Sequence, residues 1–267
     1  MSVGINFLTE LFDAGKSYST INSAQSALSQ FVSITNEHGS QDFGKHPLTV
    51  KFMRGVFKLR PTVSRHSETW DVRLVTAYLG SIDSFSCSLK DLSLKCATLL
   101  AIASGQRVQT LAAVEVGGVV PAADGGVICK VDSVLKTSRP GFQQRHIHLC
   151  RYSADTSICP ASCLAAYLEK TKLLRGDHSA LFVSFVGPHK PVSAATLGRW
   201  ISTTLRLAGV PSCFSAHSTR AASTSKAAGR IPIDAVLSAA GWTNEQTFAR
   251  FYNRPISTLS FSEAVLS

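Results

Sequence analysis

The sequence has no C-x-x-C pair, no cluster of acidic residues and no apolar stretch long enough to span a bilayer. These absences argue against a zinc finger, a magnesium-dependent enzyme and a membrane-spanning protein. Charged residues are also scarce, at 16% of the 267 positions, whereas hydrophobic residues make up 45%. So much apolar sequence predicts a folded chain with a sizeable core, arranged as one large domain or two modest ones.

Seven cysteines are present, an odd number. Cys159 and Cys163 stand four apart beside Pro160, but no second pair accompanies them, so a metal site is not expected. We interpret the cysteines as buried thiols in a reducing compartment. The first ten residues contain neither the basic region nor the apolar region of a secretory signal, which agrees with that interpretation.

The formal net charge is +10, from 27 basic and 17 acidic residues. A surplus of this sign favours a polyanionic partner, with nucleic acid as the first candidate and an anionic membrane surface as the second. Charge alone does not distinguish these partners from a merely basic soluble protein. No G-x-S-x-G segment is present, and acidic residues near a candidate nucleophile are sparse, so a small-molecule hydrolase is not expected.

Residues 1–62 are predicted to form a short helical module. Ser19 or Thr20 can cap a helix whose apolar stripe continues to Ile34, and turn-forming residues follow it. Basic residues are then interleaved with apolar ones just before a stretch at 61–66 that is typical of a linker.

Residues 67–267 are predicted to form a second, mainly α-helical domain with one small antiparallel β-sheet, an α+β fold. The sheet would consist of two strands joined by a turn-like tip at 136–141. Serine and proline residues mark the helix starts, and glycines mark several helix ends. The expected strands are 127–135 and 142–149, and the expected helices are 89–104, 160–173, 193–209, 215–229, 233–239 and 244–252.

Tyr252 is the first candidate for chemistry. A phenol titrates at about pH 10, so a tyrosine is a useful nucleophile only if a neighbour removes its proton and cations neutralise the phosphate that it attacks. Arg250 and Arg254 flank the tyrosine. They favour proximity to phosphate, and the alternative is an ordinary buried tyrosine on a helix.

His217 and Arg220 are three residues apart, so on a helix their side chains share one face and can converge on a single phosphate. Ser215 is a suitable cap, which places the pair in the first turn. Free amide hydrogens and the positive end of the helix dipole suit an anion there. The alternative is a surface helix start with an incidental histidine and arginine.

Three further residues offer donors to a phosphate. Arg107 follows the helix break at Gly105, and its planar guanidinium matches two phosphate oxygens. Lys136 begins the tip between the two strands, where an ammonium could enter a DNA groove and protonate a leaving oxygen. The indole N–H of Trp242 can donate one hydrogen bond. Singly, each has an ordinary alternative: a solvated arginine, an exposed turn lysine and a core tryptophan.

The order of these residues resembles the active-site order of the tyrosine recombinases, the lambda-integrase-like family: Arg107, Lys136, His217, Arg220, Trp242 and Tyr252. Two phrases, Ser-Tyr-Ser-Thr-Ile-Asn-Ser-Ala at 17–24 and Ala-Gly-Trp at 240–242, are similar to the versions encoded by DIRS-type retrotransposons and related eukaryotic mobile elements. The resemblance covers most of the chain.

The resemblance implies a tyrosine recombinase catalytic domain preceded by a helical core-binding module that clamps DNA. It implies that Tyr252 attacks a scissile phosphate and forms a 3′-phosphotyrosyl bond, which releases a 5′-hydroxyl. Lys136 would protonate the departing oxygen, and His217 would take or relay the tyrosine proton. Arg107 and Arg220 would bind the non-bridging oxygens and stabilise the charge that develops in the transition state.

Trp242 would donate a hydrogen bond and pack against the nucleophile helix. The same resemblance implies that no metal or nucleotide cofactor is needed, because the covalent ester stores the energy for rejoining. The partner would be double-stranded DNA, with a homotetramer on two duplexes. The location would be nuclear for a eukaryotic mobile element and otherwise cytoplasmic.

Three departures from the family pattern are present. An acidic residue often stands where this chain has Thr110, so Arg107 needs support from elsewhere. Trp242 lies one residue further from Tyr252 than is usual, which implies a slightly longer connection. The module at 1–62 is shorter than the family's core-binding domain, which suggests a truncated copy with a weak grip on DNA.

Phosphate contacts should supply much of the DNA affinity. The candidate residues are Lys51, Arg54, Lys58 and Arg60 in the first module, and Arg139, Arg145 and Arg199 in the second. Two other functions stay open at this point. One is DNA relaxation like that of a type IB topoisomerase, and the other is a catalytically inactive, domesticated DNA-binding protein.

Overall fold

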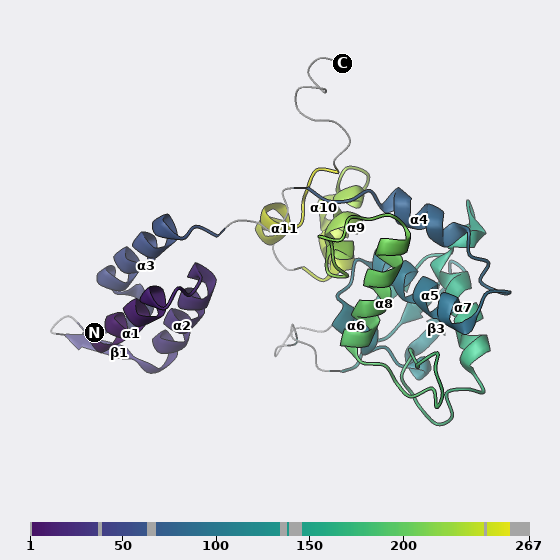
Figure 1. Ribbon diagram of the computed structural model, residues 1–267, viewed down its shortest axis with the longest axis horizontal. Coiled ribbons are helices and arrows are strands. Elements are labelled where there is room, and N and C mark those ends of the chain that lie inside the picture. The colour runs from purple at the N-terminus through teal and green to yellow at the C-terminus, as the bar shows by residue number, and fades with distance from the viewer. Residues whose placement is uncertain are drawn as a thin grey trace, which may run out of the picture. The chain divides into compact units, whose positions relative to one another are not determined.

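The computed structural model describes residues 2–36, 39–62, 68–133, 138, 146–242 and 245–256. The chain divides into two compact units, Met1–Arg65 and His66–Ser267 (Figure 1). Among the described residues, no helix combines the length and the apolar character that a membrane crossing requires.

Helices dominate the first unit, with a short hairpin between the second and third. Ser17, and not Ser19 or Thr20, caps the second helix, because its Oγ accepts the N–H of Thr20 at 3.3 Å. That helix ends before Ile34, which lies in a strand instead, since this β-branched stretch pairs with the next strand. The elements are α1 (Ser2–Asp13), α2 (Tyr18–Phe31), β1 (Ser33–Asn36), β2 (Gly39–Asp42), η1 (Phe43–Lys45) and α3 (Pro47–Leu59).

The first unit has a small core of its own, formed by Leu8, Ile21, Phe43, Met53 and Val56. The guanidinium of Arg60, just after α3, binds the chain at and after the end of α1. That group donates hydrogen bonds to the carbonyls of Phe12, at 2.7 Å, and Lys16, at 2.9 Å. Its Cζ also lies 3.9 Å from the ring centroid of Phe12. Arg60 therefore joins the end of α3 to the end of α1.

The second unit is mainly helical with a small antiparallel sheet, as predicted (Figure 1). Its helices are α4 (Val72–Gly80), α5 (Leu89–Ser104), α6 (Val108–Ala112), η2 (Val116–Gly118), η3 (Thr156–Ile158), α7 (Pro160–Thr171), α8 (Ala194–Leu207), α9 (Ser218–Ala228), α10 (Ile233–Ala240) and α11 (Glu245–Phe251). Its strands are β3 (Val119–Pro121), β4 (Val127–Cys129) and β5 (Ile147–Leu149).

Helix α5 is the centre of this unit and packs against α7, α8 and α9. Ser88 caps its start, and Gly105 ends it in the left-handed conformation, with φ +60°. Most of the helix is buried on all sides, which is why its sequence is apolar without a clear stripe. The packing of α5 in the core thus fixes the position of Gly105, where the helix ends just before Arg107.

The sheet has the order β3-β4-β5, and Val127 pairs with Leu149 while Cys129 pairs with Ile147. The predicted strand 127–135 is too long, because β4 ends at Cys129. Of the predicted strand 142–149, only 147–149 is a strand, and 142–145 lie outside the described residues. β3 was not predicted from the sequence.

Four cysteines are buried as expected, namely Cys96, Cys129, Cys159 and Cys163. The prediction is wrong for Cys150 and Cys213, which are exposed, and Cys87 is half-buried. The exposed pair lies in loops after β5 and α8, where no core element covers the thiols.

Candidate active site

Arg220 is the most deeply buried cation among the candidate residues, with 1% of its surface exposed. It lies in the first turn of α9, and its Nη1 donates a hydrogen bond of 2.7 Å to the carbonyl of Gly105. That carbonyl is available because the left-handed Gly105 ends α5 beside α9. Two segments separated by more than a hundred residues are thereby locked together around one guanidinium.

Two other nitrogens of Arg220 lack a hydrogen-bond partner in the part of the chain that the structure describes. Its Nε and Nη2 are buried without a hydrogen-bond acceptor among the described residues, and so is the indole Nε1 of Trp242. Buried donors of this kind are costly unless a ligand satisfies them. Burial first, and the nearby charge of Arg107 second, lower the pKa of Arg220 to about 10, and Tyr252 opposes part of the shift. The site therefore has donors and positive charge that an anion would satisfy.

Trp242 holds the guanidinium from one side. The Cζ of Arg220 lies 3.9 Å from the indole centroid. The preceding residue, Gly241, ends α10 in the left-handed conformation, which turns the indole back over α9. The same ring lies 4.6 Å from the ring of Tyr252, centroid to centroid. Trp242 thus contacts both the charge and the candidate nucleophile.

Tyr252 directly follows α11, and its hydroxyl lies 3.4 Å from Nε2 of His217. His217 is the N-cap residue of α9 and is exposed. The helix starts later than predicted, because the carbonyl of Ser215 accepts both the N–H and the hydroxyl of Ser218 in a turn. The i and i+3 spacing still brings His217 and Arg220 to the same tyrosine.

Arg107 reaches this region from the loop after α5. It is half-buried and forms the N-cap of α6, where its carbonyl accepts the N–H groups of Thr110 and Leu111. Thr110 offers no charge to support the guanidinium. Support for the loop comes instead from Gln106, whose amide donates a 2.7 Å hydrogen bond to the carbonyl of Ala239. Arg107 is thereby tied to the end of α10, close to Trp242.

Sequence reasoning missed Ser225, a residue of α9 that positions the tyrosine segment. Its hydroxyl donates to the carbonyl of Tyr252 at 2.6 Å and accepts the N–H of Arg254 at 2.9 Å. The chain then pairs with residues before α4, where Thr69 N–H donates to the carbonyl of Pro255 at 3.0 Å. A lone serine in a helix has no sequence signal for such a role.

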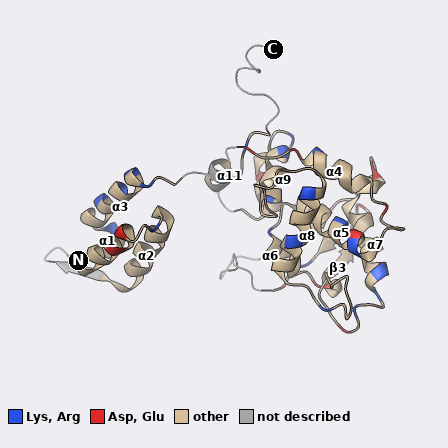
Figure 2. Ribbon diagram, in the orientation of Figure 1, with Lys and Arg blue, Asp and Glu red and all other residues tan. Residues whose placement is uncertain are grey.

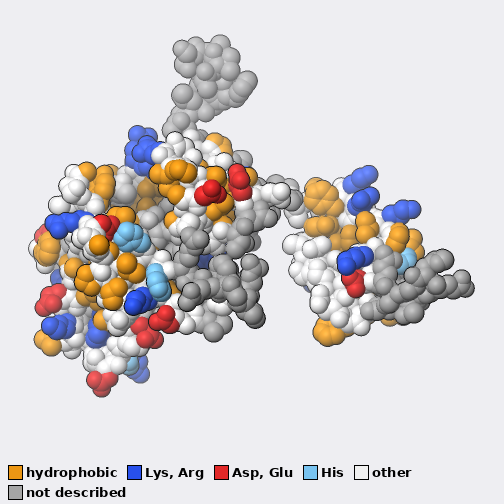
Figure 3. All heavy atoms as spheres, turned by 180° about the vertical axis from the view of Figure 1, so that it is seen from behind, with side chains coloured by type: hydrophobic (Ala, Val, Ile, Leu, Met, Phe, Trp, Pro, Cys, Tyr) orange, Lys and Arg blue, Asp and Glu red, His pale blue; other side chains and the backbone are white. Residues whose placement is uncertain are grey.

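The remaining predicted residues fall into four groups. Lys136, Arg139 and Arg145 lie outside the described residues. Arg199 is exposed on α8, with one donor bound to the hydroxyl of Thr196. Lys51, Arg54 and Lys58 are exposed on α3, where the ribbon of Figure 2 has several basic positions, and Figure 3 shows basic side chains at the surface of this unit. Arg60 is already engaged with the carbonyls of its own unit.

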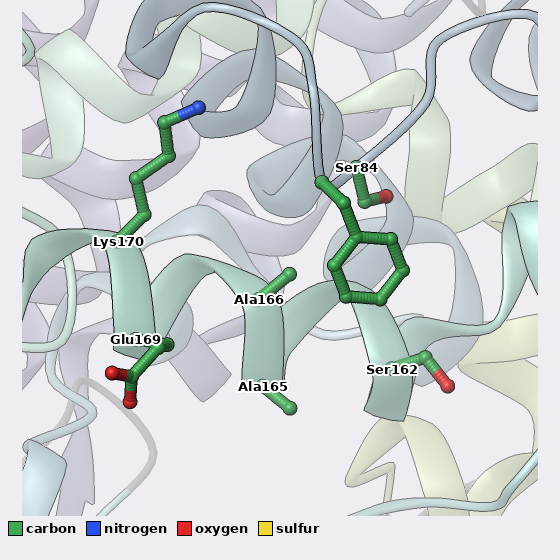
Figure 4. A pocket seen from close by; sticks show the side chains of 7 residues that line it. Ser84, Ser162, Ala165, Ala166, Glu169 and Lys170 are labelled. Carbon is green, nitrogen blue, oxygen red and sulfur yellow. The ribbon is translucent and has the colours of Figure 1, made fainter.

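A hollow of about 670 Å³ lies between α7 and the loop before α5 (Figure 4). Phe85 and the alanines of α7 line it, with Glu169 and Lys170 at one end. It contains none of the candidate catalytic residues. The candidate catalytic residues that the structure describes lie elsewhere, at the converging ends of α9, α10 and α11 and in the loop after α5.

A tyrosine, a histidine, two arginines and an indole thus lie together at one edge of a mainly helical domain, and these are residue types that a tyrosine-based transfer of phosphodiester bonds would use. Residues 72–257 match the phage integrase family, which is most of the chain. The chain belongs to this family, the tyrosine recombinases, which cleave and rejoin DNA. No curated protein sequence gives a significant match.

Many solved structures share the fold, and the three that follow do so at low identity. The XerH site-specific recombinase bound to palindromic difH substrate, a post-cleavage complex, has a TM-score of 0.61 at 16% identity, covering 92% of this chain and 66% of that chain. The Tn1549 transposon integrase with transposon right end DNA has a TM-score of 0.60 at 14% identity, covering 99% and 83%. A lambda integrase tetramer bound to a Holliday junction has a TM-score of 0.55 at 17% identity, covering 96% and 66%.

Proposed function

We propose that this chain is a site-specific DNA recombinase in which Tyr252 is the nucleophile. The phenol oxygen attacks the scissile phosphorus, the bond between phosphorus and the 5′-oxygen breaks, and a 3′-phosphotyrosyl ester forms. His217 accepts or relays the phenolic proton, and Lys136 gives a proton to the departing 5′-oxygen. Rejoining reverses these steps, so bonds and protons balance without a cofactor.

The charge on the phosphoryl oxygens increases in the transition state. The unpartnered Nε and Nη2 of Arg220 and the indole N–H of Trp242 supply fixed donors for that charge, and Arg107 adds a second guanidinium. Because Gly105 and the indole already hold the Arg220 side chain, little reorganisation is needed when the phosphate arrives.

One observation carries the proposal: the hydroxyl of Tyr252 lies 3.4 Å from an imidazole nitrogen, beside buried guanidinium nitrogens that lack an acceptor within the described ranges of the chain. A merely structural tyrosine would need neither feature. The distance is long for a hydrogen bond, and it is expected to shorten when substrate neutralises the arginines.

The test is a suicide substrate, a duplex with the ends of the chain's own mobile element and a nick beside the cleavage point. Loss of the short nicked fragment prevents rejoining, so a covalent protein–DNA adduct should accumulate on a denaturing gel. The Tyr252→Phe protein should give no adduct, whereas Tyr152→Phe, a change of an exposed tyrosine outside the site, should retain it. No adduct from wild-type protein that binds this DNA would favour an inactive, domesticated DNA-binding protein.

The proposed assembly is a homotetramer on two duplexes, similar to that of the lambda integrase structure. In a two-duplex assay, exchange of cleaved ends supports recombination, and rejoining only within one duplex supports topoisomerase-like relaxation. The proposed source is a DIRS-type mobile element with a nuclear site of action. An adjacent reverse transcriptase gene would support this source, and its absence would favour another mobile element.

A further inference from the structure

Three side chains with metal-binding atoms meet at one end of the small sheet. Asp124 lies in the turn between β3 and β4, His148 lies in β5, and Cys150 directly follows β5. The pairing of Val127 with Leu149 places the turn beside the end of β5. One potential ligand atom from each of the three lies within 4.8 Å of the others.

We propose that Asp124, His148 and Cys150 bind one Zn²⁺ ion. The Oδ2 of Asp124 lies 3.2 Å from Nε2 of His148, and Sγ of Cys150 lies 3.9 Å from the other imidazole nitrogen. Two ligand atoms at about 2.0 Å from a tetrahedral Zn²⁺ are roughly 3.3 Å apart. The carboxylate and Nε2 of the imidazole therefore already have the spacing of two ligands of one ion. The thiol now faces Nδ1 and must turn toward Nε2 to become the third ligand.

The carboxylate is held in place by the turn. The N–H of Gly126 donates a 2.9 Å hydrogen bond to Oδ1 of Asp124, which leaves Oδ2 directed at the imidazole. A Cβ at position 126 would lie 2.4 Å from the carbonyl oxygen of Leu149, so only glycine lets the turn approach β5 this closely. The turn is thus built to bring an acidic ligand against the end of the strand.

The donor set suits Zn²⁺ better than a hard cation. Thiolate and imidazole bind borderline and soft ions, whereas Mg²⁺ and Ca²⁺ prefer oxygen ligands alone. A thiolate and a carboxylate together neutralise the two positive charges. All three side chains are exposed, so an ion has direct access, and a water molecule can fill the fourth position.

Sequence reasoning did not expect this site, because it considered Cys159 with Cys163 and not residues separated by 24 positions. A bound ion would join the turn before β4 to the end of β5. These are the two strands on either side of residues 130–146, which contain Lys136. Because Val127 pairs with Leu149 and Cys129 with Ile147, the metal would hold these strands together at the end opposite to that segment. The binding claim itself does not depend on the recombination chemistry.

Cobalt is a suitable probe, because Co²⁺ bound by a thiolate gives a sulfur-to-metal charge-transfer absorption in the near ultraviolet. Reduced full-length wild-type protein, without thiol reductants, should bind one Co²⁺ with this absorption, and Zn²⁺ should displace it. Cys150→Ser should abolish the band. Cys213→Ser, a change of the other exposed cysteine, should leave band and affinity unchanged.

Asp124→Asn keeps an oxygen for the Gly126 N–H but removes the charge, and it should weaken Zn²⁺ binding at least tenfold, because even residues outside the ligand set cost about 10- to 100-fold. Zn²⁺ at about one hundred times its Kd should raise the melting temperature of wild type and Cys213→Ser by about 5 °C, but not that of Cys150→Ser. A stoichiometry other than one, a band that survives Cys150→Ser, or equal affinity in Asp124→Asn would overturn the proposal and leave only a His148–Asp124 ion pair.

Discussion

The guanidinium of Arg220 lies against the indole of Trp242, with 3.9 Å between Cζ and the ring centroid. The indole fixes the guanidinium by cation–π contact without using any of its N–H groups. One of them is bound to the carbonyl of Gly105, and Nε and Nη2 have no acceptor among the residues that the structure describes. The pair is therefore rigid and still able to bind an oxyanion.

The pH dependence of cleavage should report this buried charge. The pKa of Arg220 is about 10, below that of an ordinary arginine because of burial and Arg107. The free enzyme keeps the charge below that pH, so kcat/KM for cleavage should fall as the pH rises through about 10. The Arg220→Lys protein should cleave about 10²- to 10³-fold more slowly. The pH at which its kcat/KM falls should be about two units lower, because the unperturbed pKa of a lysine is lower than that of an arginine.

Single-turnover cleavage at several pH values, with duplex integrity checked at each, would measure both profiles. The exposed Arg206 on α8 provides the control, since Arg206→Lys should leave the profile unchanged. Identical falling limbs for wild type and Arg220→Lys would show that another group controls the loss.

Alanine substitutions at two glycines should distinguish a loss of stability caused by backbone strain from a loss of cleavage rate. Gly105 and Gly209 both have positive φ, +60° and +82°. Alanine at either should cost about 1–2 kcal/mol in free energy of unfolding. At Gly105 the added Cβ would also lie 3.3 Å from Thr224 of α9, whereas at Gly209 it meets nothing within 4 Å. Only Gly105→Ala should therefore disturb Arg220 and slow cleavage, by about tenfold or more.

Denaturant unfolding together with single-turnover cleavage tests this pair. Equal losses of stability with unequal losses of rate are expected. If Gly209→Ala slowed cleavage as much as Gly105→Ala, general destabilisation would account for both.

Ser225→Ala should release the tyrosine segment. Without the hydroxyl, the carbonyl of Tyr252 and the N–H of Arg254 both lose a partner. Cleavage should fall about 10- to 100-fold, because small misplacements of a nucleophile have effects of this size. DNA binding should stay unchanged, and Ser225→Thr should recover most of the rate.

Ser223 is the matched control on the same helix, since its buried hydroxyl has no hydrogen-bond partner among the described residues. Gel-shift affinity and the rate of adduct formation are the measurements. A Ser225→Ala protein that cleaves as fast as Ser223→Ala would remove the positioning role.

The basic face of α3 should control the salt dependence of DNA binding. Lys51, Arg54 and Lys58 are exposed there. Changing all three to glutamine should lower the slope of log K against log salt by as much as about 0.9 for each phosphate that is no longer neutralised. Arg60→Gln should behave differently. It should cost about 1–3 kcal/mol of stability and leave the slope unchanged, because its guanidinium is bound within the module.

Titrations at several salt concentrations give the slope, and denaturant unfolding gives the stability. An unchanged slope in the triple variant would show that α3 does not touch DNA.

Local signals in the sequence predicted much of the helical framework. Pro160 opens α7, Ser193 caps α8, and Gly105 ends α5, as expected. These signals act within one turn, so tertiary contacts do not override them. The prediction that Ile34 belongs to the helix was wrong, because its β-branched segment pairs with β2. The helical spacing of apolar residues contains no information about this pairing.

The site was predicted as a set of residue types in order, but not as an arrangement. The burial of Arg220 depends on the carbonyl of Gly105, 115 residues away, and the sequence pattern around His217 carries no trace of it. The anchor at Ser225 and the convergence of Asp124 with His148 arise in the same way, from contacts between distant segments.

Ser225 and Thr69 hold the residues after α11 against the same domain that contains Arg220. Under the proposed function, each polypeptide would thus carry both its nucleophile and the arginines that assist it. Assemblies mixed from Arg220→Ala and Tyr252→Phe chains should consequently show no complementation. A variant subunit should fail to cleave only the DNA strand that it binds itself. The cleavage activity of a mixed assembly should therefore decrease in proportion to the fraction of variant subunits, and wild-type subunits should not restore it.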